Sequence, residues 1–160
     1  MPPAKHFVEV DDREIQRGLT YFLLARSPEA ESPTAMTNLE LVSKILIGLV
    51  ALTHIYILIL EMFLWTKPTG LKTFRMSEVQ AQTTKVLAAN QGLYNGFLAA
   101  GLIWALVYPS AYFGRELALF FLGCVVVAAL YGSHTVGKRI FFVQGLPALL
   151  AFLTTLFVSF

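Results

Sequence analysis

A carboxyl group and several carboxamides lie inside long apolar stretches of this sequence. Glu61, the Asn90–Gln91 pair and Gln144 each lie about five residues from the end of such a stretch, at ends that face the same side in the orientation derived below. A charge or an amide in hydrocarbon is costly, so it usually faces other helices and finds a partner there. The common depth predicts one polar pocket, suited to ligand binding or to proton exchange.

Helical geometry extends this pocket. His54 precedes Glu61 by seven residues, which puts both on nearly the same helical face. Tyr94 and Asn95 continue the polar arc that begins at the Asn90–Gln91 pair. We therefore predict that a small amphipathic or polar molecule is bound by these residues: Glu61, Asn90, Gln91, Tyr94, Asn95 and Gln144.

Catalysis is a second interpretation of the same residues. Glu61 would be the acid or base and His54 or His134 its partner, acting on a lipid-like substrate by proton transfer. The spacing from His54 to Glu61 is too long for one helix to present two metal ligands together, and no cofactor fingerprint is visible, so we expect neither a metal nor a cofactor. A structural subunit of a membrane complex is the third interpretation, with the amides serving only as interhelical hydrogen bonds.

The composition predicts an integral membrane protein. Hydrophobic residues make up 56% of the 160 residues and charged residues 14%. A membrane helix needs roughly 20 apolar residues, and no stretch alternates as a membrane strand would. We expect an all-α fold of four antiparallel transmembrane helices in a compact bundle, with spans at about residues 41–65, 86–108, 117–134 and 140–160.

The distribution of Lys and Arg predicts the orientation. The first connection carries Lys67, Lys72, Arg75 and Lys85, and the third carries Lys138 and Arg139, whereas the second has only Arg115. Basic residues in short loops favour the cytoplasmic side. We expect a multi-pass protein of the cell membrane, with the first and third loops cytoplasmic and both termini extracytoplasmic. The same loop location argues against nucleic acid as a partner.

The first 35 residues differ from the remainder. They are polar, they hold six of the ten Asp and Glu residues, and Pro28 and Pro33 interrupt the segment that follows an amphipathic pattern. We interpret residues 1–35 as a disordered tail or as an extension upstream of the true start at Met36, and residues 36–160 as the transmembrane domain.

Small residues predict where helices approach closely. Gly92 and Gly96 belong to a ridge of small side chains spaced by four, which serves either packing within one chain or a homodimer. Pro147 removes a hydrogen-bond donor beside Gln144, so an irregular helix is expected there. The lipid bilayer is the other expected partner.

Three blocks together resemble a known family. They are residues 54–62 (HIYILILEM), 90–96 (NQGLYNG) and 138–148 (KRIFFVQGLPA). The chain is similar over about residues 39–160 to a family of small bacterial four-helix inner-membrane proteins known only as a domain of unknown function. The resemblance implies a fold and a location in the membrane, but it implies no activity. An acidic residue often precedes the position of His54 in that family, where this chain has Thr53.

Overall fold

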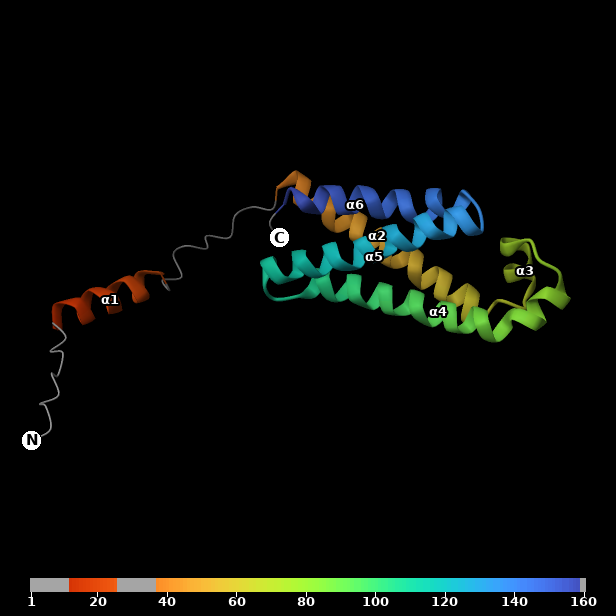
Figure 1. Cartoon of the computed structure of the whole chain (residues 1–160), viewed down its shortest axis with the longest axis horizontal. Helices are drawn as coiled ribbons and strands as arrows, with labels where there is room; N and C mark the ends of the chain where they lie inside the picture. The colour runs from red at the N-terminus through yellow and green to blue at the C-terminus, as the bar shows by residue number, and fades with distance from the viewer. Residues whose placement is uncertain (1–11, 26–36, 159–160) are drawn as a thin grey trace, which may run out of the picture. The chain divides into compact units, whose positions relative to one another are not determined.

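The chain divides into two units, Met1–Ala35 and Met36–Phe160, which are considered separately. The computed structural model describes residues 12–25 and 37–158, and all regular structure in these residues is helical (Figure 1). The prediction of an all-α fold is confirmed. We call the second unit the helical unit.

The first unit contains α1 (Asp12–Ala25), an amphipathic helix. Its Ile15 side chain is exposed. The interpretation of residues 1–35 as a disordered tail, or as an extension upstream of the true start, concerns in large part residues outside the described ones. That interpretation stays a prediction.

The helical unit is built from long helices joined by short connections. Its elements are α2 (Asn38–Met62), α3 (Pro68–Phe74), α4 (Glu78–Val107), α5 (Ala111–Thr135), the π-helical turn η2 (Phe141–Gly145) and α6 (Leu146–Leu156). The helix α2 packs against α4 and α6, and α5 packs against α4, η2 and α6. Among the described residues, two helices, α2 and α5, are long and apolar enough to cross a membrane, and the apolar segment Phe141–Leu156 is shorter.

The helix boundaries differ from the predicted spans where polar residues begin or end a helix. The helix α4 starts eight residues before the predicted position 86, because the Ser77 hydroxyl accepts from the Gln80 backbone and the Gln80 side chain accepts from the Ser77 backbone. Likewise, α2 starts at Asn38, where the Thr37 side chain caps its first turn. Apolar composition alone does not detect such polar turns.

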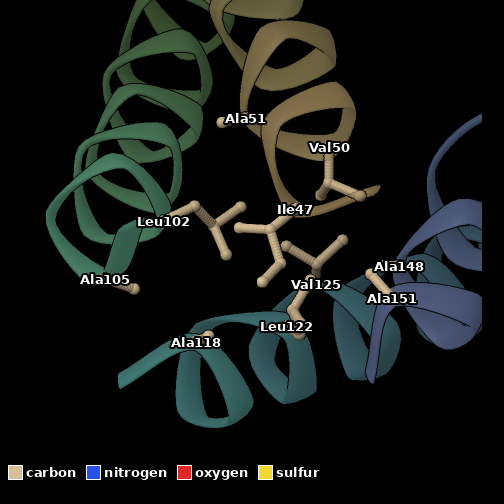
Figure 2. Packing of buried hydrophobic residues seen from close by; sticks show 10 residues of the cluster. All are labelled: Ile47, Val50, Ala51, Leu102, Ala105, Ala118, Leu122, Val125, Ala148 and Ala151. Atoms are coloured by element: carbon tan, nitrogen blue, oxygen red, sulfur yellow. The ribbon is translucent and has the colours of Figure 1, made fainter. Parts of the chain in front are cut away.

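Small side chains dominate the buried positions of the helical unit. Ile47 and Val50 of α2 meet Leu102 of α4 and Leu122 and Val125 of α5, as Figure 2 shows. Alanines fill the margins of this cluster, and nine of the sixteen buried hydrophobic residues in the described part of the chain are alanines. Because alanine is small, the helix backbones approach one another closely.

Polar contacts fasten one end of the helical unit. The buried hydroxyls of Ser43 on α2 and Thr155 on α6 lie 2.7 Å apart. Arg115 of α5 donates to the carbonyl oxygens of Thr155 and Leu156 at 3.1 and 2.9 Å. These carbonyls end α6 and have no partner within their own helix, so a cation satisfies both their hydrogen bonding and the helix dipole.

The opposite end is closed by α3, which folds back on the end of α2. A Cβ atom on Gly70 would lie 2.6 Å from the carbonyl oxygen of Trp65 and closer still to that of Leu64. The Trp65 ring lies 4.6 Å from the ring of Phe74, and its Nε1 donates to Thr84 Oγ1 at 3.1 Å. Only glycine permits this approach of α3 to the chain end of α2.

We expect the substitution Gly70→Ala to displace α3 and to lower the free energy of unfolding by about 1–3 kcal/mol. The added methyl group would overlap backbone atoms of Leu64 and Trp65, which cannot move aside as a flexible side chain could. The matched control is Gly48→Ala in α2, where an added Cβ meets nothing within 4 Å. This control should be neutral or stabilising by up to about 1 kcal/mol. Thermal unfolding followed by circular dichroism measures both, and equal effects would contradict the packing described for Gly70.

Candidate functional site

The site starts from the close approach of α2 and α4. A Cβ atom on Gly92 would lie 2.7 Å from Met62 Cγ and 3.1 Å from Glu61 Cβ, and one on Gly96 would lie 2.6 Å from Leu58 Cδ1. The two glycines of the predicted ridge therefore receive side chains of α2 from the same chain. A homodimer through Gly92 and Gly96 stays a prediction, and in this structure α2 covers both positions.

This approach brings a carboxyl group and a carboxamide together. Asn95 Nδ2 donates to Glu61 Oε2 at 2.9 Å and to the carbonyl oxygen of Gln91 at 3.1 Å. Asn95 is buried and Glu61 is half-buried. The second contact fixes the Asn95 amide against its own helix, so its position relative to Glu61 is set before any ligand arrives.

One face of α4 is covered by α5 at one end and uncovered at the other. At the covered end, Leu102 and Ala105 are buried in the core and Gly101 accommodates the ring of Phe121. These residues share one face of α4, about 100° wide, with four residues that lie nearer the start of the helix: Leu98, Tyr94, Gln91 and Leu87.

Exposure along this face rises toward the start of α4. Leu98 is half-buried, Tyr94 is 57% exposed, Gln91 is exposed and Leu87 is 70% exposed. In Figure 1 the ribbons of α4 and α5 separate in the same direction, toward α3. We call Leu87, Gln91 and Tyr94 the uncovered α4 face, and Asn95 lies beside it on the helix.

Two of the predicted ligand-binding residues lie apart from this arrangement. Asn90 is exposed and lies about 100° around α4 from Gln91, away from α2. Gln144 is half-buried on η2, which packs against α5 and α6. Within residues 37–158, neither side chain hydrogen-bonds to Glu61 or Asn95. Their role in ligand binding stays a prediction.

The two candidate catalytic histidines occupy different environments. His54 is buried, and its Nδ1 lies 2.8 Å from the carbonyl oxygen of Val50 on the same helix. His134 is exposed in the last turn of α5. In the part of the chain that the structure describes, neither histidine is hydrogen-bonded to Glu61, so the geometry provides no paired acid and base.

Sequence reasoning did not identify Leu58 and Met62, the α2 residues that fill the space above Gly96 and Gly92. Their spacing of four matches the spacing of the two glycines on α4. Antiparallel helices with matched spacings can place large residues of one into gaps of the other. The matched spacing of four is visible in the sequence, but many other pairs of residues on these helices have the same spacing.

Comparison with known proteins identifies relatives without an assigned activity. The family described as "Protein of unknown function (DUF1304)" matches residues 48–156. The "Uncharacterized protein YpaA" of Lactococcus lactis subsp. lactis (strain IL1403) is 38% identical over 111 residues, which is 68% of this chain and 92% of that protein. No solved structure matches the chain.

We expect Asn95→Leu to lower the free energy of unfolding by about 1–2 kcal/mol, because it leaves the half-buried Glu61 without its donor. Asn90→Leu is the matched control, since it makes the same change on an exposed position of the same helix. The control should leave stability nearly unchanged. Thermal unfolding of the two variants in detergent makes the comparison, and a loss in Asn90→Leu as large as in Asn95→Leu would show that the Glu61 contact is not the cause.

Proposed function

The chain belongs to the DUF1304 family, whose function is unknown, and we propose that it is a membrane-spanning protein that binds or transports a small amphipathic molecule. The polar group of that molecule would bind at Glu61 and Asn95. The observation that carries the proposal is the 2.9 Å contact between the half-buried Glu61 and the buried Asn95, which lies beside the uncovered α4 face.

The surface of the helical unit supports residence in a membrane. Large hydrophobic side chains are exposed along every long helix, including Leu52 at 62%, Phe97 at 57%, Phe120 at 64% and Leu153 at 44%. A water-soluble protein rarely exposes contiguous apolar surface of this extent. Small residues inside and large apolar residues outside are the arrangement that lipid-facing helices adopt.

We propose that α2, α4, α5 and the η2–α6 segment each cross the membrane. The helix α4 is less apolar than α2 and α5 because it carries Asn90, Gln91 and Asn95, and two of these residues, Gln91 and Asn95, are part of or adjacent to the proposed site. In the proposed orientation, the connections at α3 and between α5 and η2 face the cytoplasm. Glu61 and Asn95 then lie near the cytoplasmic side.

The site is suited to a ligand that donates hydrogen bonds. Glu61 has a second carboxyl oxygen besides the one that accepts from Asn95, and this oxygen can accept from a hydroxyl or an amine. Gln91 and Tyr94 are exposed on the adjacent face and can contribute further polar contacts. The apolar part of the ligand would lie along Leu87 and the neighbouring apolar surface.

The geometry favours binding over proton-transfer catalysis. An acid–base mechanism needs a partner within hydrogen-bond reach of the reacting group. In the described residues Glu61 is bonded to an amide, which does not exchange protons as a histidine does. The enzyme interpretation therefore has less structural support than the binding interpretation.

The first test is membrane residence. Alkaline carbonate extraction of membranes from expressing cells should leave the protein in the pellet, because spanning helices resist extraction that releases peripheral proteins. Recovery of the full chain in the supernatant would contradict the proposal.

The second test is a copurified ligand. Native mass spectrometry of the detergent-purified chain should detect a small amphipathic molecule, and Glu61→Gln should weaken its retention about tenfold or more, because a hydrogen bond to a charged group is lost. Glu78→Gln is the control, since it removes an exposed carboxyl group at the same end of the helical unit. Equal retention in the wild type and Glu61→Gln, or no bound molecule in any sample, would favour a structural subunit instead.

A further inference from the structure

Positive charge is concentrated at the end of the helical unit that carries α3. Residues 36–160 contain eight Lys and Arg residues, and six of them are exposed in the two connections at this end or in the first turns of α4. Among the described residues, Glu78 is the exposed acid that accompanies them. We call this group the basic end, and it consists of Lys67, Lys72, Arg75, Lys85, Lys138 and Arg139.

The two ends of the helical unit differ in how their cations are neutralised. At the far end, Lys44 pairs with Glu40 at 2.8 Å and Arg115 pairs with Glu116 at 2.7 Å. Within the described ranges, no ion pair joins any cation of the basic end to an acid. The basic end therefore presents charge to an outside partner, whereas the far end satisfies its charge internally.

The α3 connection, which carries Lys67, Lys72 and Arg75 of the basic end, is also held in one arrangement. Gly70 lets α3 approach the end of α2, and Trp65 contacts both Phe74 and Thr84. Arg75 adopts a left-handed backbone with φ 53°, which turns the chain from α3 toward α4. A loop that only had to determine orientation would need the charges but not this fixed geometry.

Exposed apolar side chains lie in the same part of the chain as the cations around α3. Phe63 is 64% exposed, Phe74 is 38% exposed and Val79 is 74% exposed. A partner must therefore offer negative charge next to apolar surface. The headgroup region of a bilayer with anionic lipids offers both, and attraction of one Lys or Arg to it is worth about fivefold in affinity.

We propose that the basic end is a preformed binding surface for the headgroups of anionic phospholipids, with Lys67, Lys72 and Lys85 as its principal contacts. This inference rests on the membrane residence proposed above, but it does not depend on ligand binding at Glu61.

The test uses the full chain in nanodiscs that contain equal amounts of phosphatidylglycerol and phosphatidylcholine, because a nanodisc presents the same lipids on both sides and the result does not depend on orientation. Native mass spectrometry after release from the nanodisc counts the lipids that stay bound. The wild type should retain phosphatidylglycerol over phosphatidylcholine by about tenfold or more. The variant Lys67→Gln/Lys72→Gln/Lys85→Gln should lose most of this preference.

Two controls separate charge from packing and position. The variant Lys67→Arg/Lys72→Arg/Lys85→Arg keeps the charges and should keep the preference, and Lys44→Gln at the far end should also keep it. If the triple Gln variant does not fold, the three single Gln variants should each reduce the preference by up to about fivefold.

Two results would overturn the proposal. The first is a wild type with no preference for phosphatidylglycerol, and the second is a folded triple Gln variant with the wild-type preference. Either result leaves membrane residence intact if the protein enters the nanodisc. Failure of the wild type to enter the nanodisc would contradict both membrane residence and lipid binding at the basic end. The ligand test with Glu61→Gln is independent, since its result changes neither of these two conclusions.

Discussion

The arrangement of the helical unit depends on the close approach of α2 and α4. Gly92 and Gly96 provide the space that Met62 and Leu58 occupy, so the two backbones lie nearer than larger residues would allow. At this separation the short Asn95 side chain reaches Glu61. The polar contact is thus a consequence of the packing.

Alanine is the most frequent buried hydrophobic residue among the described residues of the helical unit, and many large apolar side chains are exposed. In water, burial of large apolar side chains drives folding. Here buried alanines such as Ala99, Ala118 and Ala148 contribute little burial of their own. Close backbone packing and hydrogen bonds, including the buried contact between Ser43 and Thr155, therefore help to hold the helices together, in addition to the apolar core cluster.

The sequence predicted the helical class and the approximate position of each long helix, because long apolar stretches are a strong signal. Helix ends were less predictable, since caps such as Ser77 are polar and lie outside those stretches. Depth grouped Glu61 with Asn90, Gln91 and Gln144, and Asn95 was included only as part of the polar arc on its helix, yet Asn95 is the residue that hydrogen-bonds to Glu61. Depth gives only one coordinate, and the rotation of each helix is decided by packing against its neighbours, which one sequence does not reveal.

The wide turn η2 has a consequence for the geometry of the last helix. The backbone N–H of Leu146 reaches back five residues to the carbonyl oxygen of Phe141, and a Cβ atom on Gly145 would lie 3.0 Å from Ala129 Cβ. Such a turn accommodates one extra residue without breaking the helix axis. The extra residue rotates the side chains that precede η2 about the helix axis, relative to the positions they would have in an uninterrupted α-helix. The helical spacing that places the side chains of α6 therefore cannot be extended back through η2.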